Sequence, residues 1–194
     1  MIWKHLFAEL YGTFVLTFGV TIAFGLNFAV GSALFIAIVS SGMISGAHFN
    51  PAVTTAVLLV GAMKKEISRD IVYKHFAYYI MQIIGAILGG LVAWGTIGRT
   101  FKMHISDDYT TGQGFIGEMV ITCLLCMTAM MQGEFRQAGL VGPLVIGLVI
   151  FFGATVVGPI TSGCFNPAVG IGANFNDAWN NGGDDRVKWL WLYI

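Results

Sequence analysis

The sequence predicts an all-α membrane protein, an inverted-repeat bundle of six spans with two re-entrant half-helices, in which the sixth span is incomplete. The first observation is composition: 56% of the 194 residues are hydrophobic and 10% are charged. The mean hydropathy of +0.77 is too high for an ordinary soluble domain. The second is a series of apolar runs of about 20 residues, the length that crosses a bilayer. The third is a short motif that occurs once in each half of the chain.

The apolar runs place the predicted spans. The first run, from about Leu6 to Val30, is longer than the core of a signal peptide and lacks a small-residue cleavage pattern, so we interpret it as a retained span. The 26 glycines favour a closely packed bundle, because small residues let helices approach each other in lipid. The spans are predicted at about 6–28, 30–47, 72–95, 114–132 and 139–157.

A sixth span is predicted to begin within residues 186–194, where tryptophan and tyrosine resemble the aromatic belt of a membrane interface. The sequence stops about two helical turns into it. An end there would leave a carboxylate and unpaired carbonyls inside the bilayer, so we expect the true C-terminus to lie beyond residue 194. The alternative is that these residues form a surface tail.

Charged residues fall between the apolar runs and predict the orientation of the chain. One side carries basic residues, namely Lys4, Lys64, Lys65, Arg69, Lys74 and Arg136. The other side carries a mixture that is mostly acidic, namely Arg99, Lys102, Asp107, Asp108, Asp177, Asp184 and Asp185. Because basic loops stay in the cytoplasm, the N-terminus is predicted to be cytoplasmic.

Composition also argues against two classes of site. The formal net charge is zero, so no basic surface is expected to attract nucleic acid. The three cysteines, at 123, 126 and 164, are too few for a disulfide framework. Cys123 and Cys126 lack the second ligand pair that zinc needs. We expect neither metal nor cofactor.

An internal repeat divides the chain. Residues 46–53 recur as 162–169, with Phe-Asn-Pro-Ala-Val identical in both copies, and residues 8–12 have a weaker counterpart in 116–120. Each half is predicted to contain two spans, then a loop, then a third span. Since three spans per half invert the second copy, this is an inverted repeat of the kind found in transport proteins. We therefore expect one membrane domain over 1–194, with repeat one at about 1–95 and repeat two at about 114–194.

The repeated Asn-Pro-Ala has the chemistry of a helix start. Asn50 and Asn166 are good N-caps, and Pro51 and Pro167 fit the first helical position, where no N–H is needed. Two short helices are predicted, at about 51–60 and 167–174. Each is too short to span, so both are expected to line a buried, wet cavity. Their positive N-termini and the two amides would meet in a common lumen, where they could donate to a solute and repel cations. The alternative is that each asparagine only caps its helix.

These motifs resemble those of the aquaporin and aquaglyceroporin family, also called major intrinsic proteins. The resemblance rests on the duplicated Asn-Pro-Ala and on residues 8–14 and 44–48, and it covers the chain apart from the missing part of the sixth span. It implies a channel fold and a homotetramer with one pore in each protomer. It also implies that Glu9 and Glu118 are buried and accept backbone N–H bonds from the pore loops, as the cost of a carboxylate within a span independently suggests.

Another position similar to the family pattern is His48, which would lie near the cytoplasmic mouth; alternatively it is a hydrogen-bonded packing residue. The chain departs from the family at the outer filter. Family members usually carry arginine three residues after the second asparagine, and here Val169 occupies that position. The other filter positions fall on Val30, Ala154 and the backbone near Gly163. We therefore predict an outer constriction that is apolar, uncharged and wide, and we do not expect strict water selectivity.

Two functions follow from these features. The first is a passive channel for water or small uncharged solutes such as glycerol. The second is a non-conducting scaffold, or a subunit of a larger membrane assembly, with an apolar neck closed by dewetting. An enzyme is not expected, because no nucleophile accompanies a histidine and an acid in a recognisable arrangement.

Overall fold

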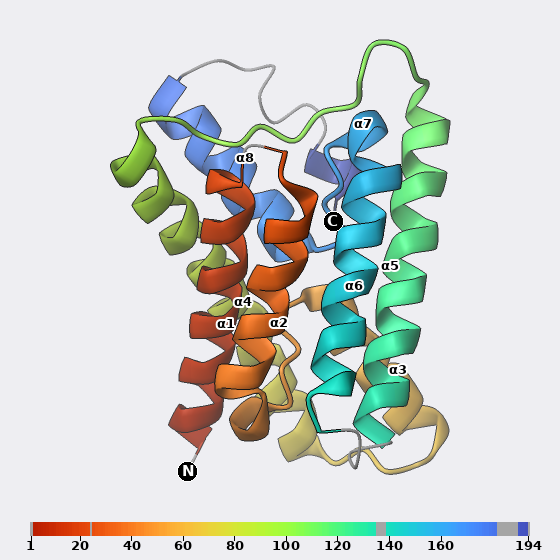
Figure 1. The fold of residues 1–194 in the computed structure, drawn as a ribbon. Helices are drawn as coiled ribbons and strands as arrows, with labels where there is room; N and C mark the ends of the chain where they lie inside the picture. Colours follow the sequence, from red (N-terminus) through yellow and green to blue (C-terminus); the bar gives the residue numbers. More distant parts are fainter. Residues whose placement is uncertain (1, 24, 135–138, 182–189, 194) are drawn as a thin grey trace.

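The computed structural model describes residues 2–23, 25–134, 139–181 and 190–193, and these form a bundle of helices (Figure 1). In chain order the helices are α1 (Ile2–Ile22), α2 (Asn27–Ser45), α3 (Pro51–Met63), α4 (Arg69–Ile97), α5 (Thr111–Glu134), α6 (Val141–Val156), α7 (Gly158–Thr161) and α8 (Pro167–Asn181), followed by the 3-10 turn η3 (Leu190–Leu192).

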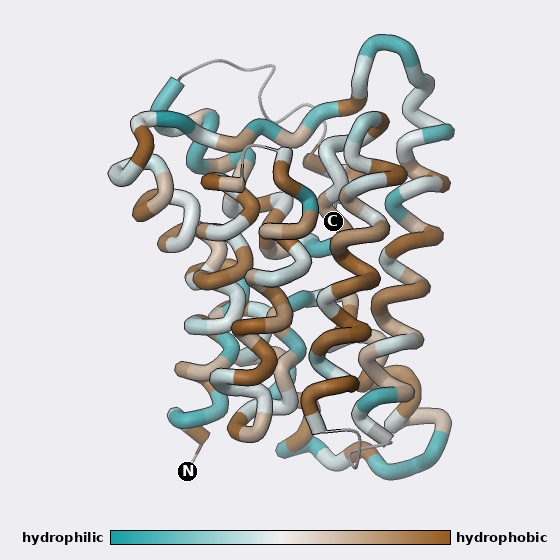
Figure 2. The backbone as a smooth tube through the Cα atoms, viewed as in Figure 1, coloured by the Kyte–Doolittle hydropathy of each residue, from teal (hydrophilic) through white to brown (hydrophobic). Residues whose placement is uncertain are grey.

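Four of these helices, α1, α2, α4 and α5, are long and apolar enough to cross a membrane, and α6 is a shorter apolar helix. Many large hydrophobic side chains of these helices are exposed, for example Phe7, Ile36 and Leu148, and hydrophilic segments gather at the two ends of the bundle (Figure 2). Such a surface fits a bilayer better than water, so the chain is a multi-pass integral membrane protein.

The half-helices α3 and α8 enter the bundle from opposite ends, as the inverted repeat predicts (Figure 1). Both are longer than the predicted 51–60 and 167–174. Around them α1 packs along α4, and α2 packs along α6. A Cβ at Gly85 would lie 2.3 Å from the carbonyl oxygen of Leu10. Only glycine therefore allows α1 and α4 to approach this closely.

The predicted end of the first span, residue 28, is wrong. Helix α1 ends at Ile22 and α2 begins at Asn27. Between them Gly25 has a φ of +81°, a left-handed conformation that glycine adopts without strain. The residues on both sides of this turn are apolar, so hydropathy alone does not reveal the boundary between the two helices.

The C-terminal residues are only partly described. Leu192 and Tyr193 are 7% and 4% exposed, so the surface-tail alternative is wrong for these two residues. The other residues of the predicted aromatic start, 186–189 and 194, lie outside the described residues, as do Arg136, Asp184 and Asp185.

Candidate pore

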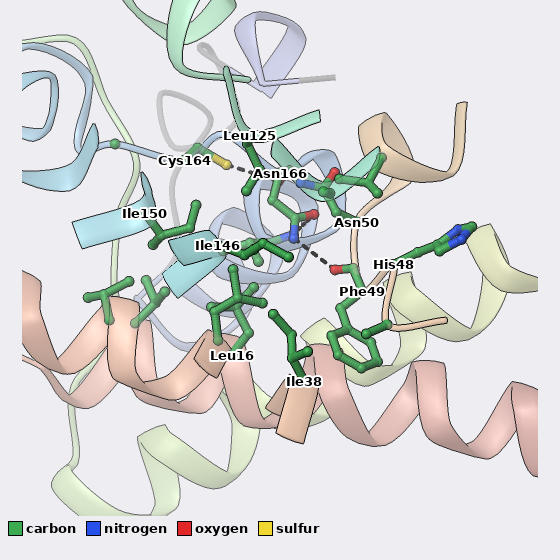
Figure 3. A pocket seen from close by; sticks show the side chains of 18 residues that line it. Leu16, Ile38, His48, Phe49, Asn50, Leu125, Ile146, Ile150, Cys164 and Asn166 are labelled. Atoms are coloured by element: carbon green, nitrogen blue, oxygen red, sulfur yellow. Dashed lines mark hydrogen bonds between the residues drawn. The ribbon is translucent and has the colours of Figure 1, made fainter. Parts of the chain in front are cut away.

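A narrow cavity lies at the centre of the bundle, between the starts of α3 and α8 (Figure 3). Its volume is about 30 Å³, which holds about two or three water molecules. Its polar wall comes from the pore loops, including Asn50, Asn166 and His48. The opposite wall is apolar and is formed by Leu16, Val20, Val30, Leu34, Ile38, Leu125, Ala129, Ile146 and Ile150.

Each of the two asparagines bonds both its own half-helix and the opposite loop. The Asn50 Oδ1 accepts from Ala52 N at 2.8 Å and so caps α3, while its Nδ2 donates to the carbonyl of Phe165 at 2.8 Å. In the same way Asn166 Oδ1 accepts from Ala168 N at 3.0 Å, and Nδ2 donates to the carbonyl of Phe49 at 2.9 Å (Figure 3). An amide NH₂ has two hydrogens, so each group can still donate one to a solute in the cavity.

The loops that lead to these asparagines share an unusual backbone. In the first loop Gly46, Ala47 and Phe49 have positive φ. In the second loop the residues at the same distances from the asparagine have positive φ too, namely Ser162, Gly163 and Phe165. This conformation is strained for residues other than glycine and persists only where several contacts fix it.

Two buried carboxylates provide such contacts. Glu9, which is fully buried, accepts from His48 N at 3.1 Å and from Phe49 N at 2.7 Å. Glu118, 5% exposed, accepts from Cys164 N at 3.1 Å and from Phe165 N at 2.8 Å. Each carboxylate therefore satisfies two backbone N–H groups of a re-entrant loop, which would otherwise lack partners away from water.

Sequence reasoning missed two further anchors. Gln82 Nε2 donates to Glu9 Oε2 at 2.8 Å and to Thr54 Oγ1 at 2.9 Å. On the other loop, the hydroxyl of Thr161 donates to Glu118 Oε1. Gln82 could have been found from the sequence, because a polar residue within an apolar span needs a hydrogen-bond partner.

The four predicted filter positions are not all at the cavity surface. Val30, Gly163 and Val169 line it. Ala154 is buried but is not among the lining residues; its Cα lies 3.2 Å from the place where a Cβ on Gly163 would stand. Ala154 therefore lies next to Gly163 but not at the cavity surface. The assignment of these residues to a filter stays a prediction.

His48 lies at the inner end of the cavity. Its Nδ1 is 3.1 Å from Thr54 Oγ1, and its ring packs on the rings of His75 and Tyr78, with centroids 5.3 and 5.4 Å away. It lines both the narrow cavity and a wider one of about 850 Å³, which reaches Lys64 at the end of α3 and Lys74 in α4. The narrow cavity thus continues into an inner vestibule.

Comparisons with known proteins point to one family. A family model described as Major intrinsic protein matches residues 1–193. "Probable aquaporin PIP-type 7a" from Pisum sativum is 30% identical, over 88% of this chain and 61% of its own length. "Aquaporin A" from Dictyostelium discoideum is 28% identical, over 82% of this chain and 57% of its own length. The chain thus spans about three fifths of the length of these relatives.

A solved structure shares the fold. It is described as "X-ray structure of the aquaglyceroporin from Plasmodium falciparum", and it covers 100% of this chain and 89% of its own with a TM-score of 0.85 and 23% identity. At this identity the likeness concerns the fold alone. Among the described residues, no three His, Cys, Asp or Glu side chains gather as metal ligands would.

Proposed function

We propose that this chain, which belongs to the major intrinsic protein family, is a passive channel for water and small uncharged solutes such as glycerol, with an apolar outer filter. The observation that carries the proposal is the central cavity. Two asparagine amides and His48 face an apolar wall, and among the described residues no Asp, Glu, Lys or Arg lines the cavity. A neutral solute can accept hydrogen bonds there, while an ion would lose its hydration without compensation.

The cavity's outer end supports a relaxed selectivity. Val169 stands where an arginine is usual and contributes neither a donor nor a charge, and Val30 and Gly163 add no polar side chain. A filter without a fixed cation discriminates solutes mainly by size and desolvation. We therefore propose that molecules larger than water pass.

The non-conducting scaffold remains the second candidate, and one observation favours it. The cavity is small and its wall is mostly apolar, and an apolar constriction can empty of water and close. A measurement of solute conduction distinguishes the two candidates. In either case we propose that the protein assembles as a homotetramer in the membrane, as the resemblance to the family implies, and a larger membrane complex is the alternative.

Reconstituted vesicles test the channel. Glycerol should enter vesicles that contain the folded protein faster than protein-free vesicles. The Val169→Arg change should slow this entry, since it adds bulk and charge at the cavity wall. Val169→Met, which adds bulk without charge, separates the two effects. Glycerol entry no faster than in protein-free vesicles, with water entry equally unchanged, would replace the channel by the scaffold.

A further inference from the structure

Two tyrosines hold the same place relative to the two pore loops. The hydroxyl of Tyr78, in α4, donates to the carbonyl of Ser45 at 2.9 Å. The hydroxyl of Tyr193, after η3, donates to the carbonyl of Thr161 at 2.7 Å. Ser45 and Thr161 are each the fifth residue before the capping asparagine of their loop. Tyr78 is fully buried and Tyr193 is 4% exposed, so water does not compete for either bond.

The residues that the tyrosines hold are the last before the strained part of each loop. The Ser45 hydroxyl accepts from Ala47 N at 3.1 Å, and the Thr161 hydroxyl accepts from Gly163 N at 3.2 Å. The residue immediately after each, Gly46 or Ser162, turns into the left-handed region. Fixing the carbonyl before this turn fixes the direction in which the loop enters the cavity.

We propose that Tyr78 and Tyr193 are equivalent positioning residues for the two pore loops. Tyr193 acts through Thr161 on the backbone at Gly163, and so sets the width of the outer filter. Tyr78 acts through Ser45 on the loop that carries His48, and so sets the inner end of the cavity. The effect on selectivity rests on the proposed channel function, whereas the effect on loop position does not.

Conservative variants separate positioning from packing. Tyr193→Phe and Tyr78→Phe remove one hydroxyl each and keep the buried ring. Tyr79→Phe is the matched control, because its hydroxyl lies 3.0 Å from Thr55 Oγ1 and contacts neither loop. The measured quantity is the ratio of glycerol to water permeability, which does not depend on the number of folded channels. This ratio should change by about threefold to tenfold in Tyr193→Phe, the factor of one typical hydrogen bond, and stay constant in Tyr79→Phe.

A second measurement needs no conduction. Cys164 lies in the outer pore loop, is 6% exposed and donates its Sγ–H to the carbonyl of Asn166 at 3.0 Å. With Cys123 and Cys126 replaced by alanine, methyl methanethiosulfonate should modify Cys164 about threefold to tenfold faster in Tyr193→Phe than in the parent. The Tyr78→Phe and Tyr79→Phe variants should react at the parent rate.

The thiol rate decides the proposal even if vesicles show no conduction, a result that would overturn the channel alone. Equal rates in Tyr193→Phe and Tyr79→Phe would overturn the positioning role. So would a Tyr193→Phe protein that gives no monodisperse peak in size-exclusion chromatography, because the hydroxyl would then be needed for folding as a whole.

Discussion

The two pore loops have nearly the same geometry in surroundings that differ. In both loops the three left-handed residues stand at the same sequence distances from the asparagine. The same holds for the backbone N–H that a carboxylate accepts from and for the carbonyl that a tyrosine donates to. Yet the helices beside the two loops differ: α1, which carries Glu9, packs along α4 and α2, whereas α5, which carries Glu118, packs on α6 and α7. The same hydrogen bonds close to the motif therefore fix both loops although the two carboxylates come from different packing environments.

The comparison also shows one asymmetry. Glu9 and Glu118 each bond a hydroxyl side chain at the start of the loop that they anchor, Ser45 and Thr161 respectively. Glu9 also accepts a hydrogen bond from Gln82, on the distant helix α4. Among the described residues, the first loop is thus tied to a further helix, whereas the second is anchored more locally. Changes that remove the carboxylates should expose this difference.

The largest effect is expected from removing the carboxylates. Glu9→Leu leaves three N–H groups without an acceptor, those of His48, Phe49 and one hydrogen of Gln82. Glu118→Leu leaves two, because the Thr161 hydroxyl can turn to the carbonyl of Val157, already 3.4 Å away. Each stranded N–H costs about 1–3 kcal/mol. Both variants should lose stability, and Glu9→Leu should lose more by about the cost of one such group.

Thermal unfolding in detergent, followed by size-exclusion chromatography, measures this order. The exposed Glu66 provides the control, since Glu66→Leu should unfold close to the parent temperature. A Glu118→Leu protein less stable than Glu9→Leu would show that the local anchor of the second loop matters more than the link to α4.

A smaller effect on stability is expected from replacing the amide groups of the asparagines by carboxyl groups. Asn50→Asp and Asn166→Asp keep a good N-cap, so α3 and α8 should still form. Each variant loses the Nδ2 donor to the opposite loop, which is 2.8 Å away for Asn50 and 2.9 Å for Asn166. Because these contacts are matched, stopped-flow measurements should show water permeability reduced by the same factor in both. Parent-like permeability in one variant alone would break the equivalence of the loops.

The starts of the two half-helices could be predicted from sequence because cap chemistry is local: an asparagine before a proline specifies where a helix begins. Two other features could not. The turn at Gly25 lies inside an apolar run, where hydropathy gives no boundary. The predicted end of the second half-helix, residue 174, lies seven residues before the end of α8 at Asn181. In the part that the prediction omits and just before it, Asn176 and Asn174 donate to carbonyls of their own helix, at Gly172 and Gly170.

Some of the residues that anchor the pore loops could likewise be predicted from the sequence, and others could not. Glu9 and Glu118 are recognisable because a carboxylate within a span is costly and needs donors. Tyr78 and Tyr193 cannot be recognised as anchors from the sequence, because their acceptors are backbone carbonyls 33 and 32 residues away.

A size series of uncharged solutes tests the central proposal most directly. Vesicles with verified folded protein are exposed to gradients of water, urea, glycerol and sorbitol, and entry is compared with protein-free vesicles. A channel with an apolar, uncharged outer filter predicts faster entry of water, urea and glycerol, and a cut-off before sorbitol. Entry of water alone would contradict the relaxed filter, and entry of none of the four would contradict the channel.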